Sequence, residues 1–61
     1  MTDKQKEVAR RAKRCLEHKH WFNGVCTDLF IDELTDAYID RIGMDEAVKR
    51  VIFDTEYWDN W

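Results

Sequence analysis

The sequence predicts an all-α fold in which three helices form one small domain over residues 1–61. Three observations support this prediction. The 61 residues include no proline and only two glycines, apolar residues recur at helical spacing in three segments, and the glycines Gly24 and Gly43 fall between those segments. Hydrophobic residues make up 44% of the chain and charged residues 38%, which argues against a disordered or collagen-like protein.

A first helix is expected from about Asp3 to about His20. Thr2 and Gln5 have the spacing of a capping box, and the residues that follow are strong helix formers. The apolar positions of this helix form one narrow stripe of mostly small side chains: Val8, Ala9, Ala12, Cys15 and Leu16. The rest of its circumference is basic, so the helix contributes a thin buried face.

A second helix is expected from about Asp28 to Ile42, and a third from about Asp45 to near the C-terminus. Gly43 separates them as a left-handed cap. The third helix is apolar on two sides, and a chain of this size buries only roughly 60% of the surface of its unfolded state. A homodimer is therefore predicted, with Phe53, Tyr57 and Trp61 as the strip for self-association. Trp58 is expected to pack in the core.

An α+β fold is the structural alternative. Asn-Gly between apolar residues is a hairpin signal, which would place a short hairpin at 20–27. Residues 51–58 alternate between apolar and polar side chains, which would add a C-terminal strand.

The net charge of −3 combines two unlike halves. Residues 1–20 carry seven Lys and Arg against three carboxylates, a balance of +4, whereas residues 21–61 carry three against ten, a balance of −7. Such polarity concerns association and orientation rather than fold. One interpretation is that the two surfaces face each other within the monomer or across a dimer.

An acidic side of the second helix is the main candidate for binding a protein partner. Four aspartates recur at every fourth position: Asp28, Asp32, Asp36 and Asp40. Apolar residues among carboxylates are typical of an interface. The predicted partner-binding residues are Asp32, Asp36, Asp40, Ile39 and Leu29. The row of charges could imitate a nucleic-acid backbone on a basic partner surface, or it could be a solvated face compensated by the basic first helix.

The basic first helix supports an alternative function, that of a nucleic-acid-binding regulator. The residues that could neutralise phosphates are Arg10, Arg11, Lys13 and Arg14. The negative total charge argues against this function, because nucleic-acid-binding domains usually carry a basic excess.

Metal binding and catalysis have little support in the sequence. Four residues could act as zinc ligands, Cys15, His18, His20 and Cys26, but their spacing matches neither paired C-x-x-C knuckles nor a two-Cys, two-His finger. The chain has no serine, and its carboxylates are spread along a surface. No metal, no cofactor and no enzymatic activity are therefore expected.

No apolar run is long enough for a membrane span or a signal-peptide core. A soluble, cytoplasmic protein is expected. In length and composition the chain resembles the small, acidic, aromatic-rich accessory proteins that phages encode. That resemblance implies a regulator or inhibitor that acts by binding a larger host protein.

Overall fold

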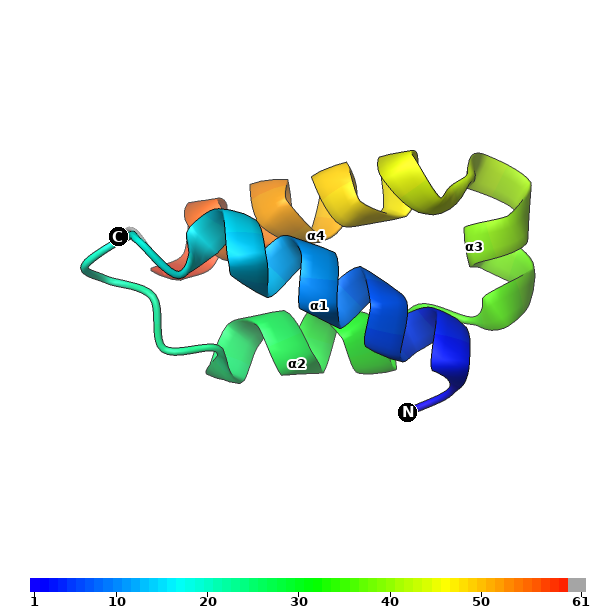
Figure 1. The fold of residues 1–61 in the computed structure, drawn as a ribbon, viewed down its shortest axis with the longest axis horizontal. Coiled ribbons are helices and arrows are strands. Elements are labelled where there is room, and N and C mark those ends of the chain that lie inside the picture. Colours follow the sequence, from blue (N-terminus) through cyan, green and yellow to red (C-terminus); the bar gives the residue numbers. More distant parts are fainter. Residues whose placement is uncertain (60–61) are drawn as a thin grey trace.

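The computed structural model describes residues 1–59 and consists of helices joined by short connections (Figure 1). The helices are α1 (Asp3–Leu16), α2 (Val25–Asp32), α3 (Asp36–Ile42) and α4 (Met44–Asp59). The all-α prediction is confirmed. The α+β alternative is wrong for this part of the chain, because residues 51–59 are helical and residues 25–27 begin α2. The fold has four helices rather than the predicted three, because a break in the predicted second helix separates α2 from α3.

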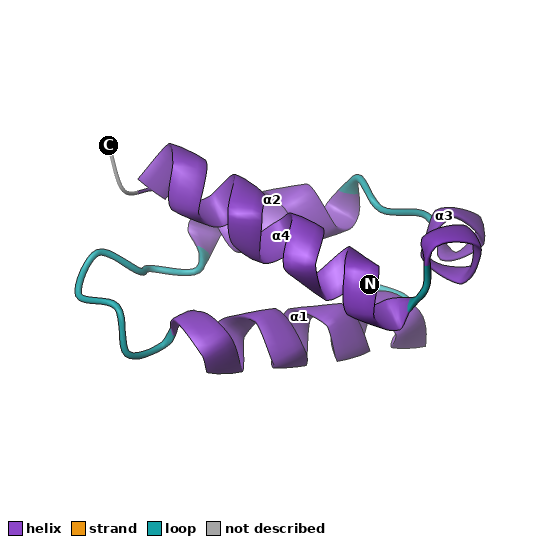
Figure 2. Cartoon of the chain, turned by 90° about the horizontal axis from the view of Figure 1, so that it is seen from above, coloured by secondary structure: helices purple, strands orange, loops and turns teal. Residues whose placement is uncertain are grey.

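Three of the helices pack side by side along the long axis of the molecule, which measures 32 × 17 × 17 Å. Helix α1 lies against α2 and α4, and α2 also packs against α4. The short helix α3 crosses one end of the molecule and connects α2 to α4, as Figures 1 and 2 show from two directions. The molecule is thus a three-helix packing closed at one end by a short crosspiece.

Helix α1 begins as predicted and ends earlier. The capping box is present: the Gln5 backbone N–H donates to the Thr2 hydroxyl at 3.2 Å, and the Thr2 backbone N–H donates to Gln5 Oε1 at 2.8 Å. The helix ends at Leu16 rather than near His20. Residues 17–20 are exposed, so a longer helix would bury no further apolar surface to stabilise it.

The predicted second helix is two helices. Between α2 and α3, Thr35 adopts an extended backbone conformation and its hydroxyl accepts a hydrogen bond from the Tyr38 backbone N–H at 3.1 Å. Thr35 is therefore the N-cap of a new helix, and Asp36 occupies the first turn, where a negative charge is favourable. Leu34 continues the apolar pattern across the break and is buried, which is why the periodicity alone suggested one helix.

Side chains at the start of α1 form hydrogen bonds with the residues around the break between α2 and α3. The Gln5 side-chain amide donates to the backbone carbonyls of Leu34 at 2.5 Å and Ile31 at 3.2 Å. The Thr2 hydroxyl donates to Asp36 Oδ1 at 2.6 Å. Carbonyls at the end of a helix have no partner within that helix. The Gln5 amide supplies a donor to the Leu34 carbonyl and a second donor to the Ile31 carbonyl, which also accepts from the Leu34 backbone N–H at 3.0 Å.

Both glycines occupy backbone conformations with positive φ. Gly24 has φ +84° and precedes α2, where Asn23 Oδ1 accepts a hydrogen bond from the Val25 N–H at 2.9 Å. Gly43 has φ +92° and separates α3 from α4. The predicted boundary at Gly43 is confirmed. Helix α2 begins three residues before the predicted Asp28.

The core lies where α1, α2 and α4 meet. Most of the predicted stripe of α1 is buried, whereas Cys15 is exposed. The buried apolar residues are Val8, Ala9, Ala12, Leu16, Ile31, Leu34, Ile39, Ala47, Val48 and Val51. The hydroxyls of Thr27 and Thr55 are buried and lie 3.1 Å apart, so that two polar groups between α2 and α4 satisfy each other.

None of the described helices combines the length and the apolar character that crossing a membrane requires.

Because the Gln5 amide donates to α2 as well as completing the capping box, the substitution Gln5→Glu should affect the protein differently from an isolated helix. A glutamate retains the acceptor of the capping box and suits a helix N-terminus, so in an isolated helix it would be neutral or stabilising. Here its carboxylate would face the Ile31 and Leu34 carbonyls without a proton to donate. We expect a loss of about 1–3 kcal/mol in the free energy of unfolding at neutral pH, measured by urea unfolding with circular dichroism.

The loss should depend on pH. The introduced carboxyl group can donate one hydrogen bond when it is protonated, so the folded state raises its pKa. The deficit should therefore be small in acid and grow as the pH rises through that pKa. Lys6→Gln is the matched control, because it changes the charge by the same amount at an exposed site on the same terminus. Equal effects of the two substitutions at all pH values would contradict the role of Gln5.

Candidate functional site

The acidic side predicted for a single second helix does not form one surface. Asp28 and Asp32 lie on α2, whereas Asp36 and Asp40 lie on α3. Helix α1 meets three of the four: Asp36 accepts from Thr2, Asp40 pairs with Lys4, and Asp28 Oδ1 lies 2.7 Å from Lys13 Nζ. Charge matching within the monomer therefore accounts for most of this row.

The apolar residues predicted on the acidic side separate from each other. Ile39 is only 2% exposed and belongs to the core, so its predicted position on a binding surface is wrong. The reason is the break before α3, which lets that helix turn its own apolar side inward. Leu29 is 60% exposed on α2, with Val25 one turn before it and Asp32 also exposed.

The basic residues of α1 are largely engaged by carboxylates. Arg10 binds Glu7 through two hydrogen bonds, Nε to Oε2 at 2.7 Å and Nη2 to Oε1 at 2.9 Å. Arg11 Nε lies 3.7 Å from Glu7 Oε1, and Arg11 Nη1 lies 3.5 Å from Asp45 Oδ1.

The side of α1 that faces away from the core carries charges of both signs. Its residues are Asp3, Lys6, Glu7, Arg10, Arg11 and Arg14, with Glu17 directly after the helix. Because Glu7 pairs with both Arg10 and Arg11, little positive charge on this side is left uncompensated for binding phosphates.

The four residues considered as zinc ligands lie around the connection between α1 and α2. Cys15 is exposed at the end of α1, Cys26 is half-buried at the start of α2, and His18 and His20 are exposed between them. Within residues 1–59 no three His, Cys, Asp or Glu side chains are grouped so that they could hold a metal ion.

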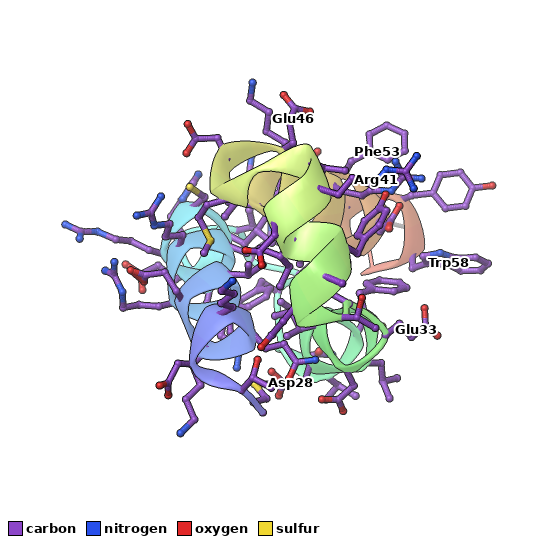
Figure 3. The ribbon with its side chains drawn as sticks, turned by 90° about the vertical axis from the view of Figure 1, so that its right-hand side faces the viewer. Asp28, Glu33, Arg41, Glu46, Phe53 and Trp58 are labelled. Atoms are coloured by element: carbon purple, nitrogen blue, oxygen red, sulfur yellow. The ribbon has the colours of Figure 1, made fainter. Side chains whose placement is uncertain are left out.

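Helix α4 has two unlike sides. One side faces α1 and α2 and buries Ala47, Val48, Val51 and Thr55. On the other side and at the end of the helix, Phe53 is 68% exposed, Tyr57 52% and Trp58 61%. Figure 3 shows Phe53 and Trp58 pointing away from the helices.

The exposure of Trp58 corrects the prediction that it packs in the core. Thr55 pairs with Thr27 near the start of α2. Trp58 lies about one turn beyond Thr55, level with the first residues of α2, so that helix does not cover its side chain. The ring of Trp58 contacts Tyr57 edge-on instead, with ring centres 5.3 Å apart and planes at 83°. Trp61, the last residue of the predicted strip, lies outside the described residues.

A shallow groove adjoins the exposed aromatic residues. It has a volume of about 560 Å³ and is lined by Tyr38 and Ile42 of α3 and by α4 residues that include Arg50, Phe53 and Asp54. A second hollow of about 340 Å³ shares Tyr38, Arg50 and Asp54 and extends toward α2. The lining of the two hollows thus combines apolar side chains with charged side chains of both signs.

We call this surface the outer face of α4. Its members are exposed or line the groove, and they are Glu46, Lys49, Arg50, Phe53, Asp54, Glu56 and Tyr57. Phe53 and Tyr57 were predicted as binding residues from the sequence, whereas the charged residues of this face were not. The spacing of Lys49, Arg50 and Glu56 from Phe53 could have predicted their place on this face, because residues three or four positions apart share one side of a helix.

No protein-family model matches the chain, and comparisons with curated proteins and with solved structures find no significant match.

The Arg10–Glu7 pair predicts a measurable titration. The hydrogen bonds from Arg10, followed by the charges of Arg10 and Arg11, lower the pKa of Glu7 below its ordinary value. A carboxylate with a lowered pKa stabilises the folded state above its ordinary pKa, and that contribution is lost as the pH falls through the lowered value. In a nuclear magnetic resonance titration, Arg10→Gln should raise the pKa of Glu7, whereas Arg14→Gln should leave it unchanged. An unaltered Glu7 titration in the Arg10 variant would contradict the pairing.

Proposed function

We propose that the chain is a protein-interaction module that binds another protein chain through the outer face of α4. The observation that supports this proposal most strongly is the exposure of Phe53 and Tyr57, one turn apart on the same side of α4, with Phe53 lining a groove. Aromatic residues of this kind are over-represented among the residues that dominate binding energy. Contiguous exposed apolar surface is also unusual on a monomer without a partner.

The proposal relocates the binding surface that the sequence predicted. Asp36 and Asp40 are engaged by the start of α1, and Ile39 is buried. Leu29 and Asp32 remain exposed on α2, but neither lines either of the two hollows described above. The outer face of α4 therefore has the stronger support.

The charges of this face favour a protein over a nucleic acid. Lys49 and Arg50 are accompanied by Glu46, Asp54 and Glu56, and the carboxylates would repel phosphates. A mixed pattern of charges around an apolar centre instead orients a protein partner and excludes wrong ones.

In this proposal the chain remains a binding protein rather than an enzyme, and it acts as a cytoplasmic regulator through the protein that it binds. Self-association, which the sequence predicts, would use the same face, because the opposite side of α4 is already covered by α1 and α2.

Affinity capture from the source cell, after nuclease treatment, tests the proposal with two variants. Phe53→Ala/Tyr57→Ala removes the aromatic centre of the outer face of α4, and Val25→Ala/Leu29→Ala removes exposed apolar surface from α2 as a matched control. All four side chains are exposed, so circular dichroism should show folded proteins. We expect the α4 variant to bind its partner on the order of 1,000-fold more weakly than the wild type, since each of the two anchors contributes about 2 kcal/mol and about 1.4 kcal/mol is a factor of ten.

The control should bind like the wild type. Capture that both variants retain in full would contradict the proposal. Loss confined to the α2 variant would move the binding site to Leu29, and capture that disappears after nuclease treatment would favour the nucleic-acid alternative.

A further inference from the structure

We infer that the occupant of the outer face of α4 is a second copy of this chain, whose α4 runs antiparallel to the first with the two-fold axis near residue 52. The inference rests on the proposed function, because it uses the same face. It is carried by the positions of four charged residues around Phe53.

Four of the five charged residues of the outer face of α4 lie along its two edges. The fifth, Glu46, lies near the centre line, about 20° from Phe53, and its carboxylate is 3.7 Å from Lys49 Nζ. At 100° per residue, Lys49 and Glu56 lie on one edge, and Arg50 and Asp54 lie on the other, with Phe53 between the edges. Lys49, Arg50 and Glu56 are exposed, and Asp54 is half-buried along the groove. Each edge therefore carries one cation and one anion.

An antiparallel pair matches these charges on both edges at once. In such a dimer the two-fold axis crosses the face, so each edge meets the same edge of the other copy in reverse order. Lys49 then lies opposite Glu56 of the second copy when the axis is at position 52.5, midway between them. Arg50 lies opposite Asp54 of the second copy when the axis is at position 52. The two edges thus require the same register to within one residue, or about 1.5 Å along the helix.

A parallel pair brings like charges together. Its two-fold axis runs along the helices, so each edge meets the opposite edge of the second copy at the same height. Lys49 would lie beside Arg50 of the second copy, and Glu56 beside Asp54. Like charges placed together in an interface are unfavourable, and the arrangement of charge therefore selects the antiparallel pair.

The aromatic residues fit the same register. An axis near position 52 places Phe53 within one turn of Phe53 in the second copy, and it places Tyr57, which lies on the Arg50 side of Phe53, near Arg50 of the second copy, where a cation–π contact is available. A fully covered aromatic side chain buries about 150–250 Å². Because Phe53 and Tyr57 are 68% and 52% exposed, four rings across two copies would bury roughly 500 Å².

That area is about two-fifths of the roughly 1,200 Å² at the lower limit of stable interfaces. The apolar stems of Lys49 and Arg50, with Tyr38 and Ile42 in the groove, are placed to supply the remainder.

Two charge-reversed variants test the inference. Lys49→Glu/Arg50→Glu makes both edges acidic, and Asp54→Lys/Glu56→Lys makes both edges basic. Each variant alone would oppose like charges at four positions of the dimer, whereas a mixture of the two would match opposite charges at all four. The control is Lys6→Glu/Lys19→Glu, which changes the net charge as much as the acidic variant does, at exposed residues outside α4.

Sedimentation should give the wild type and the control at twice 7.4 kDa. Each charge-reversed variant alone should dissociate at least about tenfold more readily, and the equimolar mixture should regain the mass of the dimer. If circular dichroism shows either double variant to be unfolded, Lys49→Glu and Glu56→Lys carry the same test on one edge.

A wild type that stays at the mass of one chain up to millimolar concentration would overturn the inference and leave the proposed function standing, with a different protein on this face. Charge-reversed variants that each dimerise like the wild type, or a mixture that stays monomeric, would overturn the antiparallel pair.

Discussion

The hydrogen bonds from the Gln5 amide to the carbonyls of Ile31 and Leu34 hold the break between α2 and α3, and the rest of the structure depends on that break. A continuous helix over residues 25–42 would be about 27 Å long, whereas α1 is roughly 21 Å long. The break instead allows α3 to cross the end of the molecule and α4 to return along α1 and α2, packed against both (Figures 1 and 2). The same turn of α1 also holds the first residue of α3, because the Thr2 hydroxyl donates to Asp36. One end of α1 therefore determines the path of the second half of the chain.

This path also determines which surfaces remain available. It turns Ile39 inward and brings Asp36 and Asp40 to the start of α1, so the row of aspartates is divided and largely matched within the monomer. Helix α4 receives neighbours on one side only. Its opposite side keeps exposed aromatic rings between edges that each carry a cation and an anion. Because those edges are complementary to themselves in the antiparallel direction, the surface that the fold leaves uncovered is suited to a second copy of the chain.

The sequence predicts the helical class, the capping box at Thr2, the boundary at Gly43 and the exposed rings of Phe53 and Tyr57. These features depend on local chemistry: a cap within three residues, a positive φ, or a side chain opposite a buried stripe. The break before Thr35 was missed although Thr35-Asp36 is a helix start signal, because Leu34 keeps the apolar period intact across it. Ile39 and Trp58 were misplaced for a related reason. Their burial depends on where neighbouring helices begin and end. The hydrogen bonds of Gln5 join residues 26 and 29 positions apart in the sequence, so no local pattern predicts them.

The central claim is that the outer face of α4 is an interface with another chain. The most direct measurement is a search for intermolecular nuclear Overhauser effects in an equimolar mixture of isotopically labelled and unlabelled protein. The account predicts such effects between the rings of Phe53 and Tyr57 in one copy and residues of α4 near Lys49 and Phe53 in the other. Intermolecular effects confined to α1 or to Leu29 of α2 would contradict it. So would aromatic resonances that stay unchanged from micromolar to millimolar concentration with no intermolecular effects.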